Sequence, residues 1–207
     1  MKFGGRAAIL ALGLALGGCT GSLFNTTAVP PAVYLLKSQV ERGAAPPVAA
    51  DLAVLRPRVR PGLDSEHIAV LFADRRLDHF AAAAWSAPLD QVVLDLAVDS
   101  LRRRATLRGV AADDSPFAAG YWLELRVMDF QAEYAAAGDA PTIHVKLRAR
   151  LGDSTDRRVL GEFEADVRRP ASHDRLGDIV DAFNGAADEA LARLADATGA
   201  ALARPAD

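Results

Sequence analysis

The chain has 207 residues, of which 51% are hydrophobic, and its formal net charge at pH 7 is only -3. This length and apolar content suit one compact domain whose core is large enough to fold alone. The nearly balanced charge, without a long run of lysine or arginine, gives no electrostatic footprint for nucleic acid and no polybasic patch for a membrane surface. Nucleic acid is therefore not an expected partner.

Residues 1–18 have the layout of an export signal. Lys2 and Arg6 form a short basic region, and an apolar run over residues 7–16 follows it. A run of this length suits a signal peptide and is too short for a bilayer-spanning helix. The sequence therefore predicts a secretory signal rather than a membrane-spanning segment.

The signal closes on Leu16-Gly17-Gly18-Cys19, at the only cysteine of the chain. This arrangement resembles a bacterial lipoprotein signal with its lipobox. The resemblance implies that the Cys19 thiol receives a diacylglyceryl group, that the bond between Gly18 and Cys19 is cleaved, and that the new N-terminus is acylated. Several acyl chains, each contributing about 0.8 kcal/mol per buried CH₂, would anchor the protein to a membrane. No thiol would then remain for a disulfide, a metal site or a nucleophile.

Two other interpretations of this segment stay open. The signal could be an ordinary secretory one that is cleaved elsewhere, with Cys19 incidental, or it could be an uncleaved N-terminal anchor. Thr20 follows the cysteine, and lipoproteins of this type without Asp at that position usually pass to the outer membrane. We therefore expect the periplasmic face of the outer membrane, with the inner membrane as the alternative.

Residues 19–31 are expected to carry the lipid and to form a tether, and residues 32–204 to form one folded domain. The tether residues are small and polar and end in proline, which is typical of a flexible linker. A short apolar run at residues 32–36 predicts the first strand. The Pro/Ala-rich residues 43–50 predict a loop.

Two further strand regions precede the first helix. Residues 51–60 predict a strand with an edge position or an irregular end, because Pro57 and Pro61 bound it. The apolar run at residues 67–72 fits a buried strand, and residues 75–80 are expected to return as its hairpin partner.

After Ser86 the apolar residues recur at the three- and four-residue spacing of an α-helix. Ser86 or Ala87 is the expected N-cap, with Pro88 in the first turn. The apolar positions expected to face the core are Leu89, Val92, Val93, Leu96, Ala97 and Leu101.

Residues 121–134 predict a long strand whose apolar positions change phase. They are odd-numbered from Tyr121 to Val127 and even-numbered from Met128 to Tyr134. Since side chains alternate between the two faces of a strand, this change predicts a bulge or twist near Val127.

Residues 142–151 and 159–167 alternate apolar and polar side chains and predict two half-buried strands. If a hairpin places Leu151 opposite Val159, their outward faces become complementary in charge. The expected cross-strand pairs are Arg148–Glu162, Lys146–Glu164 and His144–Asp166.

The last predicted element is an amphipathic helix of some seven turns. Its apolar face is formed by Leu176, Ile179, Val180, Phe183, Ala187, Ala190, Leu191, Leu194, Thr198, Ala201 and Leu202. Such a face must be covered by a sheet. The order of elements predicts an α+β fold: a single domain with a mixed or antiparallel sheet and both amphipathic helices on one face.

The chain resembles the auxiliary lipoprotein family of ABC-type transport systems, whose members accompany mammalian-cell-entry-domain proteins in envelope lipid transport. The matching pieces, in order, are the lipobox cysteine, Val33-Tyr34-Leu35-Leu36, Leu52-Ala53-Val54 with Pro57, Gly62-Leu63-Asp64 leading to Ile68-Ala69-Val70, Arg76-Leu77-Asp78-His79-Phe80, Trp85 with Pro88-Leu89, and Tyr121-Trp122-Leu123-Glu124-Leu125 running to Asp129-Phe130. One departure is a loop of alanines, Ala81–Ala84, where the family has an aromatic-rich polar stretch.

The resemblance implies a noncatalytic periplasmic subunit on the inner leaflet of the outer membrane. Its partner would be a substrate-binding protein with the mammalian-cell-entry domain, served by an inner-membrane permease and ATPase, and phospholipids would be the cargo. The anchor would raise the local concentration of the domain at one membrane, so that a weak contact could dock the transport path there. A homo-oligomer would increase this avidity.

Motifs for catalysis or metal binding are absent from the sequence. His67, His79, His144 and His173 lie far apart without ligand spacing, and no nucleophile elbow, P-loop or dinucleotide motif occurs. We therefore expect no enzyme activity, no cofactor and no metal site, and we interpret Asp113-Asp114 as a solvated turn.

Three features could still contact a partner. Trp85 and Trp122 suit binding surfaces but are better interpreted as buried. The basic row of Lys146, Arg148 and Arg150 could meet anionic headgroups, but its acidic cross-strand counterpart favours a solvated face.

Two other functions remain as alternatives to transport docking. One is an envelope lipoprotein that aids the assembly or plugging of an outer-membrane protein. The other is a lipid-anchored hydrolase, for which no nucleophile and base can be nominated.

Overall fold

The described part of the chain forms nine strands and two helices. A computed structural model describes residues 30–116, 118–136 and 138–204. The expected signal at residues 1–18 and nearly all of the tether, including Cys19, therefore lie outside the described residues. The elements, in chain order, are β1 (Ala32–Tyr34), β2 (Val48–Val54), β3 (Arg58–Val59), β4 (His67–Phe72), β5 (Leu77–Trp85), α1 (Leu89–Arg104), β6 (Leu107–Ala112), β7 (Tyr121–Tyr134), β8 (Thr142–Asp153), β9 (Val159–Pro170) and α2 (Leu176–Leu202).

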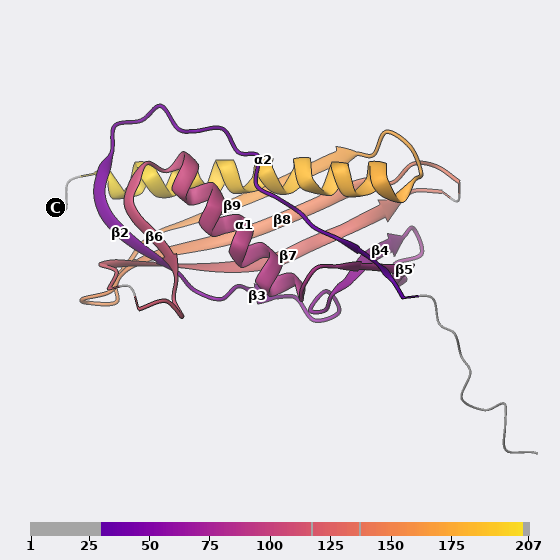
Figure 1. Cartoon of the computed structure of the whole chain (residues 1–207), viewed down its shortest axis with the longest axis horizontal. Helices are drawn as coiled ribbons and strands as arrows, with labels where there is room; N and C mark the ends of the chain where they lie inside the picture. Colours follow the sequence, from indigo (N-terminus) through magenta and orange to yellow (C-terminus); the bar gives the residue numbers. More distant parts are fainter. Residues whose placement is uncertain (1–29, 117, 137, 205–207) are drawn as a thin grey trace, which may run out of the picture. The chain divides into compact units, whose positions relative to one another are not determined.

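Both helices lie on the same face of one mixed sheet (Figure 1). α2 runs along β8 and β9, and α1 packs against α2 and over β2 and β6. The opposite face of the sheet carries no helix among the described elements. The predicted α+β architecture is therefore confirmed.

β7 is the strand that organises the sheet. Along one edge it pairs antiparallel with β8. Along the other edge β2, β3 and β4 lie parallel to it in succession, with Tyr121, Arg126 and Ala132 among their respective partners. β6 extends the sheet beyond β2, whereas β5 and β1 extend it beyond β4. β6 and β1 therefore lie at opposite ends of β7.

The phase change in β7 is a β-bulge, as predicted. Its pairing with β8 shifts between Val127 and Asp129. Leu125 before the shift and Phe130 after it are both buried in the core. Because a bulge adds one residue to one strand, it reverses the alternation and keeps Leu123, Leu125 and Val127 before the shift, and Phe130 and Ala132 after it, in the core.

β8 and β9 pair antiparallel, as predicted, but the predicted register is wrong by two residues. Leu151 lies opposite Gly161 rather than Val159, and an irregularity between Leu151 and Gly152 leaves Leu160 without a partner in the ladder. A shift of two residues returns every side chain to the same face, so the charge complementarity is preserved. The observed pairs on the outward face are Arg150–Glu162, Arg148–Glu164, Lys146–Asp166 and His144–Arg168.

Residues 51–60 form two strands instead of the one predicted. β2 begins at Val48, inside the predicted loop at 43–50, and β3 follows Pro57, which has no N–H to donate to a strand ladder. β2 is also not an edge strand, because β6 and β7 flank it.

Three other details differ from the sequence predictions. β6 has no counterpart among the predicted elements, and Ala81–Ala84, predicted as a loop, belongs to β5. The residue before α1 is Pro88, not Ser86 or Ala87, and no side chain caps the helix. The first backbone N–H of α1, at Leu89, instead donates to the carbonyl of Ser65 at 3.0 Å, which satisfies one of the free amides of the helix start.

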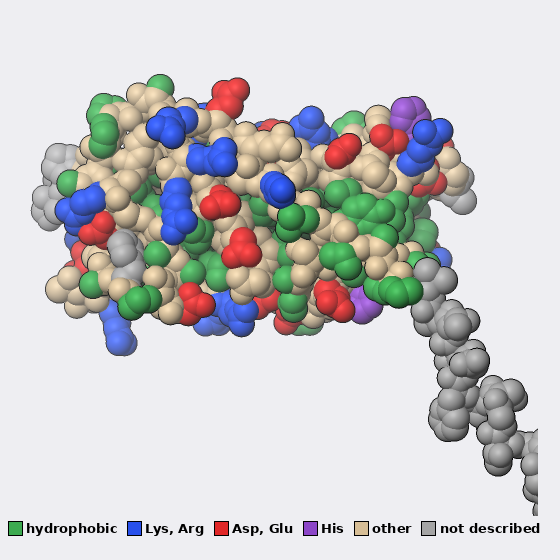
Figure 2. Space-filling model, viewed as in Figure 1, with side chains coloured by type: hydrophobic (Ala, Val, Ile, Leu, Met, Phe, Trp, Pro, Cys, Tyr) green, Lys and Arg blue, Asp and Glu red, His purple; other side chains and the backbone are tan. Residues whose placement is uncertain are grey.

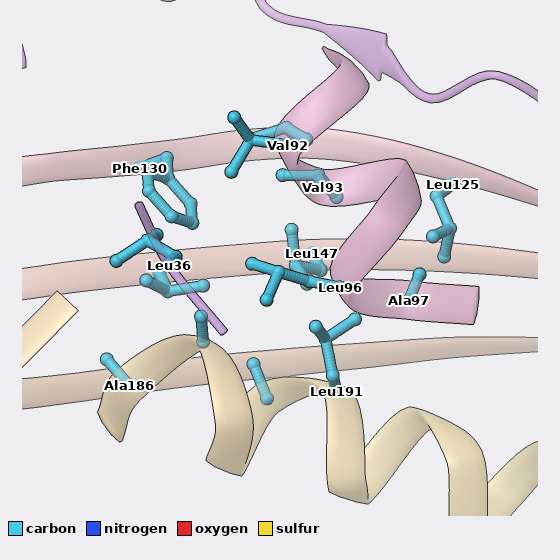
Figure 3. Packing of buried hydrophobic residues seen from close by; sticks show 14 of the residues in the cluster. Leu36, Val92, Val93, Leu96, Ala97, Leu125, Phe130, Leu147, Ala186 and Leu191 are labelled. Atoms are coloured by element: carbon cyan, nitrogen blue, oxygen red, sulfur yellow. The ribbon is translucent and has the colours of Figure 1, made fainter. Parts of the chain in front are cut away.

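The core between sheet and helices is centred on three aromatic rings. Trp85 of β5, Phe130 of β7 and Phe183 of α2 are almost fully buried. The Phe183 ring lies 5.2 Å from Trp85, edge to face, and 5.3 Å from Phe130, stacked. Figure 3 shows Phe130 beside apolar side chains from α1 and from the segment after β1. Because Trp85, Phe130 and Phe183 come from β5, β7 and α2, their contacts join the helix to the two strands.

The segment after β1 crosses the helix layer as an extended strap, which we define as residues 36–40. Leu36, Ser38 and Val40 are buried, and the residues between them are exposed. The Lys37 N–H donates to Oδ1 of Asn184 at 2.9 Å, and the Gln39 N–H donates to Oδ1 of Asp188 at 3.1 Å, while the Ser38 and Ser100 hydroxyls share a hydrogen bond of 3.0 Å. The strap therefore joins α1 to α2, directly after β1.

Candidate functional site

The sheet face opposite the helices carries a lattice of ion pairs. Between β8 and β9 its lysine and arginine contacts include Arg148–Glu164 at 2.7 Å, Lys146–Glu164 at 2.9 Å, Arg150–Glu162 at 3.0 Å and Lys146–Asp166 at 3.2 Å. Hydrogen bonds from Arg148 and Lys146 hold the pKa of Glu164 below its usual range, and the bond to Glu164 raises the pKa of Lys146. The predicted basic row is thus matched by acids, as in a solvated face.

Acidification is expected to weaken this lattice at Glu164. The folded pKa of Glu164 lies below its ordinary value of 4.5, so its contribution to stability is complete above the unfolded pKa and is lost as the pH falls through the folded pKa. The midpoint of thermal unfolding, measured by circular dichroism at a series of pH values from neutral to acidic, should decrease as the pH falls. Glu164→Gln should flatten this fall, and an unchanged slope in that variant would contradict the assignment.

His144 is buried on the outward face, although its neighbours there are charged. Its side chain lies between Glu133, 2.8 Å from Nδ1, and Asp166, 3.0 Å from Nε2. Asp166, the predicted neighbour of His144, therefore contacts it, but from a diagonal position on β9, since Arg168 lies directly opposite His144. Among the residues that the structure describes, no three His, Cys, Asp or Glu side chains are grouped to hold a metal ion.

A cleft of about 640 Å³ opens where β7 begins. Four parts of the chain contribute to its wall: the segment between β2 and β3, the turn after β6, the start of β7, and the loop between β8 and β9. The lining residues are Leu55, Arg56, Arg58, Asp113, Trp122, Glu124, Ser154 and Arg157. The cleft therefore joins segments that are far apart in the sequence.

Trp122 forms an immobilised aromatic wall of this cleft. Its Nε1–H donates to the carbonyl of Asp153 at 3.1 Å, and its ring lies directly over Gly152, where a Cβ would come within 2.1 Å of it. Trp85 is buried, as predicted, whereas Trp122 is only half-buried. The interpretation of Trp122 as a core residue is therefore replaced by that of a cleft residue.

Gly152→Ala is expected to displace Trp122, because its Cβ cannot coexist with the ring. Overpacking of this kind typically costs about 1–3 kcal/mol. Denaturant unfolding should show that loss, and the fluorescence of the native protein should shift to longer wavelength, since the other tryptophan is buried. Gly120→Ala is the matched control, because its Cβ would meet nothing within 4 Å. Equal stability and emission in both variants would contradict the described packing.

The cleft has more cationic than anionic side chains. Arg58 is paired with Glu124 at 3.0 Å, and Arg56 with Asp90 at 3.1 Å. Arg157 lies in the β8–β9 loop with a left-handed backbone (φ 59°) and an exposed side chain. Its neighbour Arg158 pairs with Asp156 at 3.6 Å, whereas Arg157 has no ion-pair partner among the described residues.

The two ends of the domain differ in surface character. At the β1 end, Val33 and Leu35 are 65% and 59% exposed, and Figure 2 shows hydrophobic side chains gathered toward the end where β4 and β5 lie. At the other end lies the cleft with its arginines. The two helices, within the described ranges, lack the combination of length and apolarity that crossing a bilayer requires.

The structure brings together few of the residues that the sequence singled out. Trp122 and Asp113 line the cleft, and Asp113 lies in a turn, as predicted. Gly18 and Cys19 lie outside the described residues. Sequence reasoning missed Arg58 and Arg157 as cleft residues, because no motif links a two-residue strand to a hairpin loop about 100 positions later.

Comparison with known proteins gives a family and a fold. The model of a family described as "ABC-type transport auxiliary lipoprotein component" matches residues 34–197. A crystal structure from Xanthomonas campestris, assigned to family DUF330, is 25% identical with a TM-score of 0.75 and covers 82% of this chain and 95% of its own. No curated protein matches the chain.

Two further structures are similar in fold alone. The crystal structure of an uncharacterized protein has a TM-score of 0.63 at 16% identity, with 80% of this chain and 97% of that chain covered. The structure of a hypothetical protein from Chlamydia trachomatis has a TM-score of 0.52 at 8% identity, with 75% and 99% covered. The fold thus recurs where the sequence has changed almost completely.

Proposed function

This chain belongs to the family of ABC-type transport auxiliary lipoprotein components, and on that premise we propose that it docks the substrate-binding component of an envelope lipid transport system at the outer membrane. The partner would be a protein with the mammalian-cell-entry domain. Family membership makes the chain an envelope lipoprotein that serves an ABC-type transporter. The docking role, the outer-membrane position and the lack of catalysis are parts of the proposal.

The anchor in this proposal is Cys19, lipidated after cleavage behind Gly18. Ten residues, Thr20–Val29, lie between Cys19 and the first described residue, and a coil of that length would span about 17 Å by its root-mean-square end-to-end distance. Such a tether holds the domain close to the membrane at a high effective concentration. A weak contact with the partner would then suffice for docking.

The observation that carries the docking role is the two-ended layout of the domain. β1, the first strand after the tether, lies at the end of β7 that pairs with β4, and the cleft lies at its beginning. The separation from Trp122 to Tyr134 along β7 is about 40 Å at the rise of an extended strand. One end is thus available to the anchor and the other to a partner.

Affinity purification tests this function. Full-length tagged protein would be purified from its native envelope beside a Cys19→Ala variant, and the co-purifying proteins would be identified by mass spectrometry. The proposal expects a mammalian-cell-entry-domain protein and its permease, in smaller amounts with the variant. Recovery of an outer-membrane barrel alone would overturn it in favour of an assembly factor.

A further inference from the structure

We propose that the cleft at the start of β7 is a docking pocket for a segment of a protein partner that carries an apolar side chain next to a carboxylate. In this proposal the apolar side chain packs on Trp122 and the carboxylate pairs with Arg157. The identification of the partner as a transport component rests on the function proposed above. The chemistry of the pocket rests on the cleft itself.

The wall formed by Trp122 is suited to receiving an apolar side chain. The indole is fixed before binding, by its hydrogen bond to Asp153 and its contact with Gly152. A fixed aromatic ring loses little conformational entropy on binding, and tryptophan and arginine are the residue types enriched at binding hot spots. Leu55 adds a second apolar surface in the same cleft.

The three arginines that line the cleft outnumber its two acids, Asp113 and Glu124, so the net charge of the lining favours a carboxylate over a cation. Two of its three arginines, Arg56 and Arg58, already have acidic partners at about 3 Å. Arg157 is exposed and has no such partner among the described residues. An arginine fork binds a carboxylate in two parallel hydrogen bonds, which adds geometric specificity. Arg157 is therefore the group that a partner's carboxylate would meet.

A protein segment fits this cleft better than a lipid does. The cleft lies at the end of β7 away from β1, and β1 is the strand that directly follows the tether. Five of its eight lining side chains are charged, and they suit the polar and charged groups of a protein segment. We therefore favour a protein segment, and the experiment is designed so that it would also detect a lipid in the cleft.

Photocrosslinking in cells tests the pocket. Ser154 is exposed and lines the cleft, so p-benzoylphenylalanine placed there in the full-length protein would capture the occupant after irradiation, and mass spectrometry would identify the linked molecule. The capture would be repeated with Arg157→Glu, with Arg157→Lys, and with Arg158→Glu. Arg158→Glu is a matched control, because Arg158 lies in the same loop but does not line the cleft.

The proposal expects a crosslink to a protein segment with Asp or Glu beside an apolar residue. Arg157→Glu should reduce that crosslink by about tenfold or more, as for a hot-spot residue. Arg157→Lys should give an intermediate yield, because it keeps the charge but loses the bidentate fork, and Arg158→Glu should leave the crosslink unchanged. A phospholipid adduct at position 154, equal crosslinking in both reversal variants, or no crosslink at all would overturn it. Unchanged circular dichroism of each variant shows that folding is intact.

The failure of this inference can be distinguished from that of the proposed function. If the mammalian-cell-entry-domain protein co-purifies equally with the wild type and with Arg157→Glu, docking stands and the pocket assignment is wrong. If an acidic segment of an unrelated protein is captured in an Arg157-dependent manner, the pocket stands and the transport role is wrong.

Discussion

Phe183→Ala is expected to lower the free energy of unfolding by about 3–5 kcal/mol, the usual cost of deleting a buried phenylalanine ring. Phe183 is fully buried and is the contribution of α2 to the aromatic centre with Trp85 and Phe130. Its loss leaves a cavity where the helix layer meets the sheet. Since domains of this size are stable by only about 5–15 kcal/mol, a large part of the stability would disappear.

Denaturant unfolding measures this effect, as a lower midpoint with an unchanged slope. Phe163→Ala is the matched control. It removes the same aromatic ring from β9, where Phe163 is only partly buried. A loss of stability as large for Phe163 as for Phe183 would contradict the central position of the aromatic cluster.

Cys19→Ala is expected to remove the protein from the outer-membrane fraction of the envelope. The substitution removes the thiol that the acyl chains would modify, and the hydrophobic contribution of those chains, about 0.8 kcal/mol per buried CH₂, is lost with it. The loss from the outer membrane would be nearly complete, because the variant would keep its uncleaved signal, which would hold it at the inner membrane.

Fractionation of the envelope followed by immunodetection measures this loss. Ser22→Ala, in the same tether, is the control and should remain with the outer membrane. An equal distribution of the wild type and Cys19→Ala between the two membranes would favour the uncleaved anchor. A wild-type protein already in the soluble fraction would favour an ordinary secretory signal.

The parts of the fold that sequence reasoning found are those with a strong local period. Strict alternation identified β8 and β9, and a change of phase located the bulge in β7 to within two residues of its position. Both depend only on which side chains must face the core. β6 was missed because its six residues, with Gly109 among them, carry no such alternation.

The register error shows a limit of charge patterns. Arg148 finds an acid whether β9 is placed with Glu162 or with Glu164 opposite it, because the acids repeat every two residues. Charge complementarity therefore fixes which face is outward but not the register. The register shifts beside Gly152, over which the Trp122 ring lies, and this tertiary contact does not show in the charge pattern.

The cleft and the strap are tertiary features and could not be predicted locally. Arg58 and Arg157 approach the same space only because β3 and the β8–β9 loop meet at the start of β7. The strap residues between Leu36 and Val40 form no strand, and their position depends on Asn184 and Asp188 in α2. Burial raises the pKa of Asp188, which reflects the cost of placing this acceptor under the strap.

The most direct test of the account is the distribution of the substrate-binding component between the two membranes. Envelopes from cells with the wild-type lipoprotein and with Cys19→Ala would be separated on a density gradient, and the mammalian-cell-entry-domain protein would be quantified in each fraction. The account predicts that part of this protein sediments with the outer membrane in the wild type and that this part is lost in the variant. An identical distribution in both cells would contradict docking by this lipoprotein.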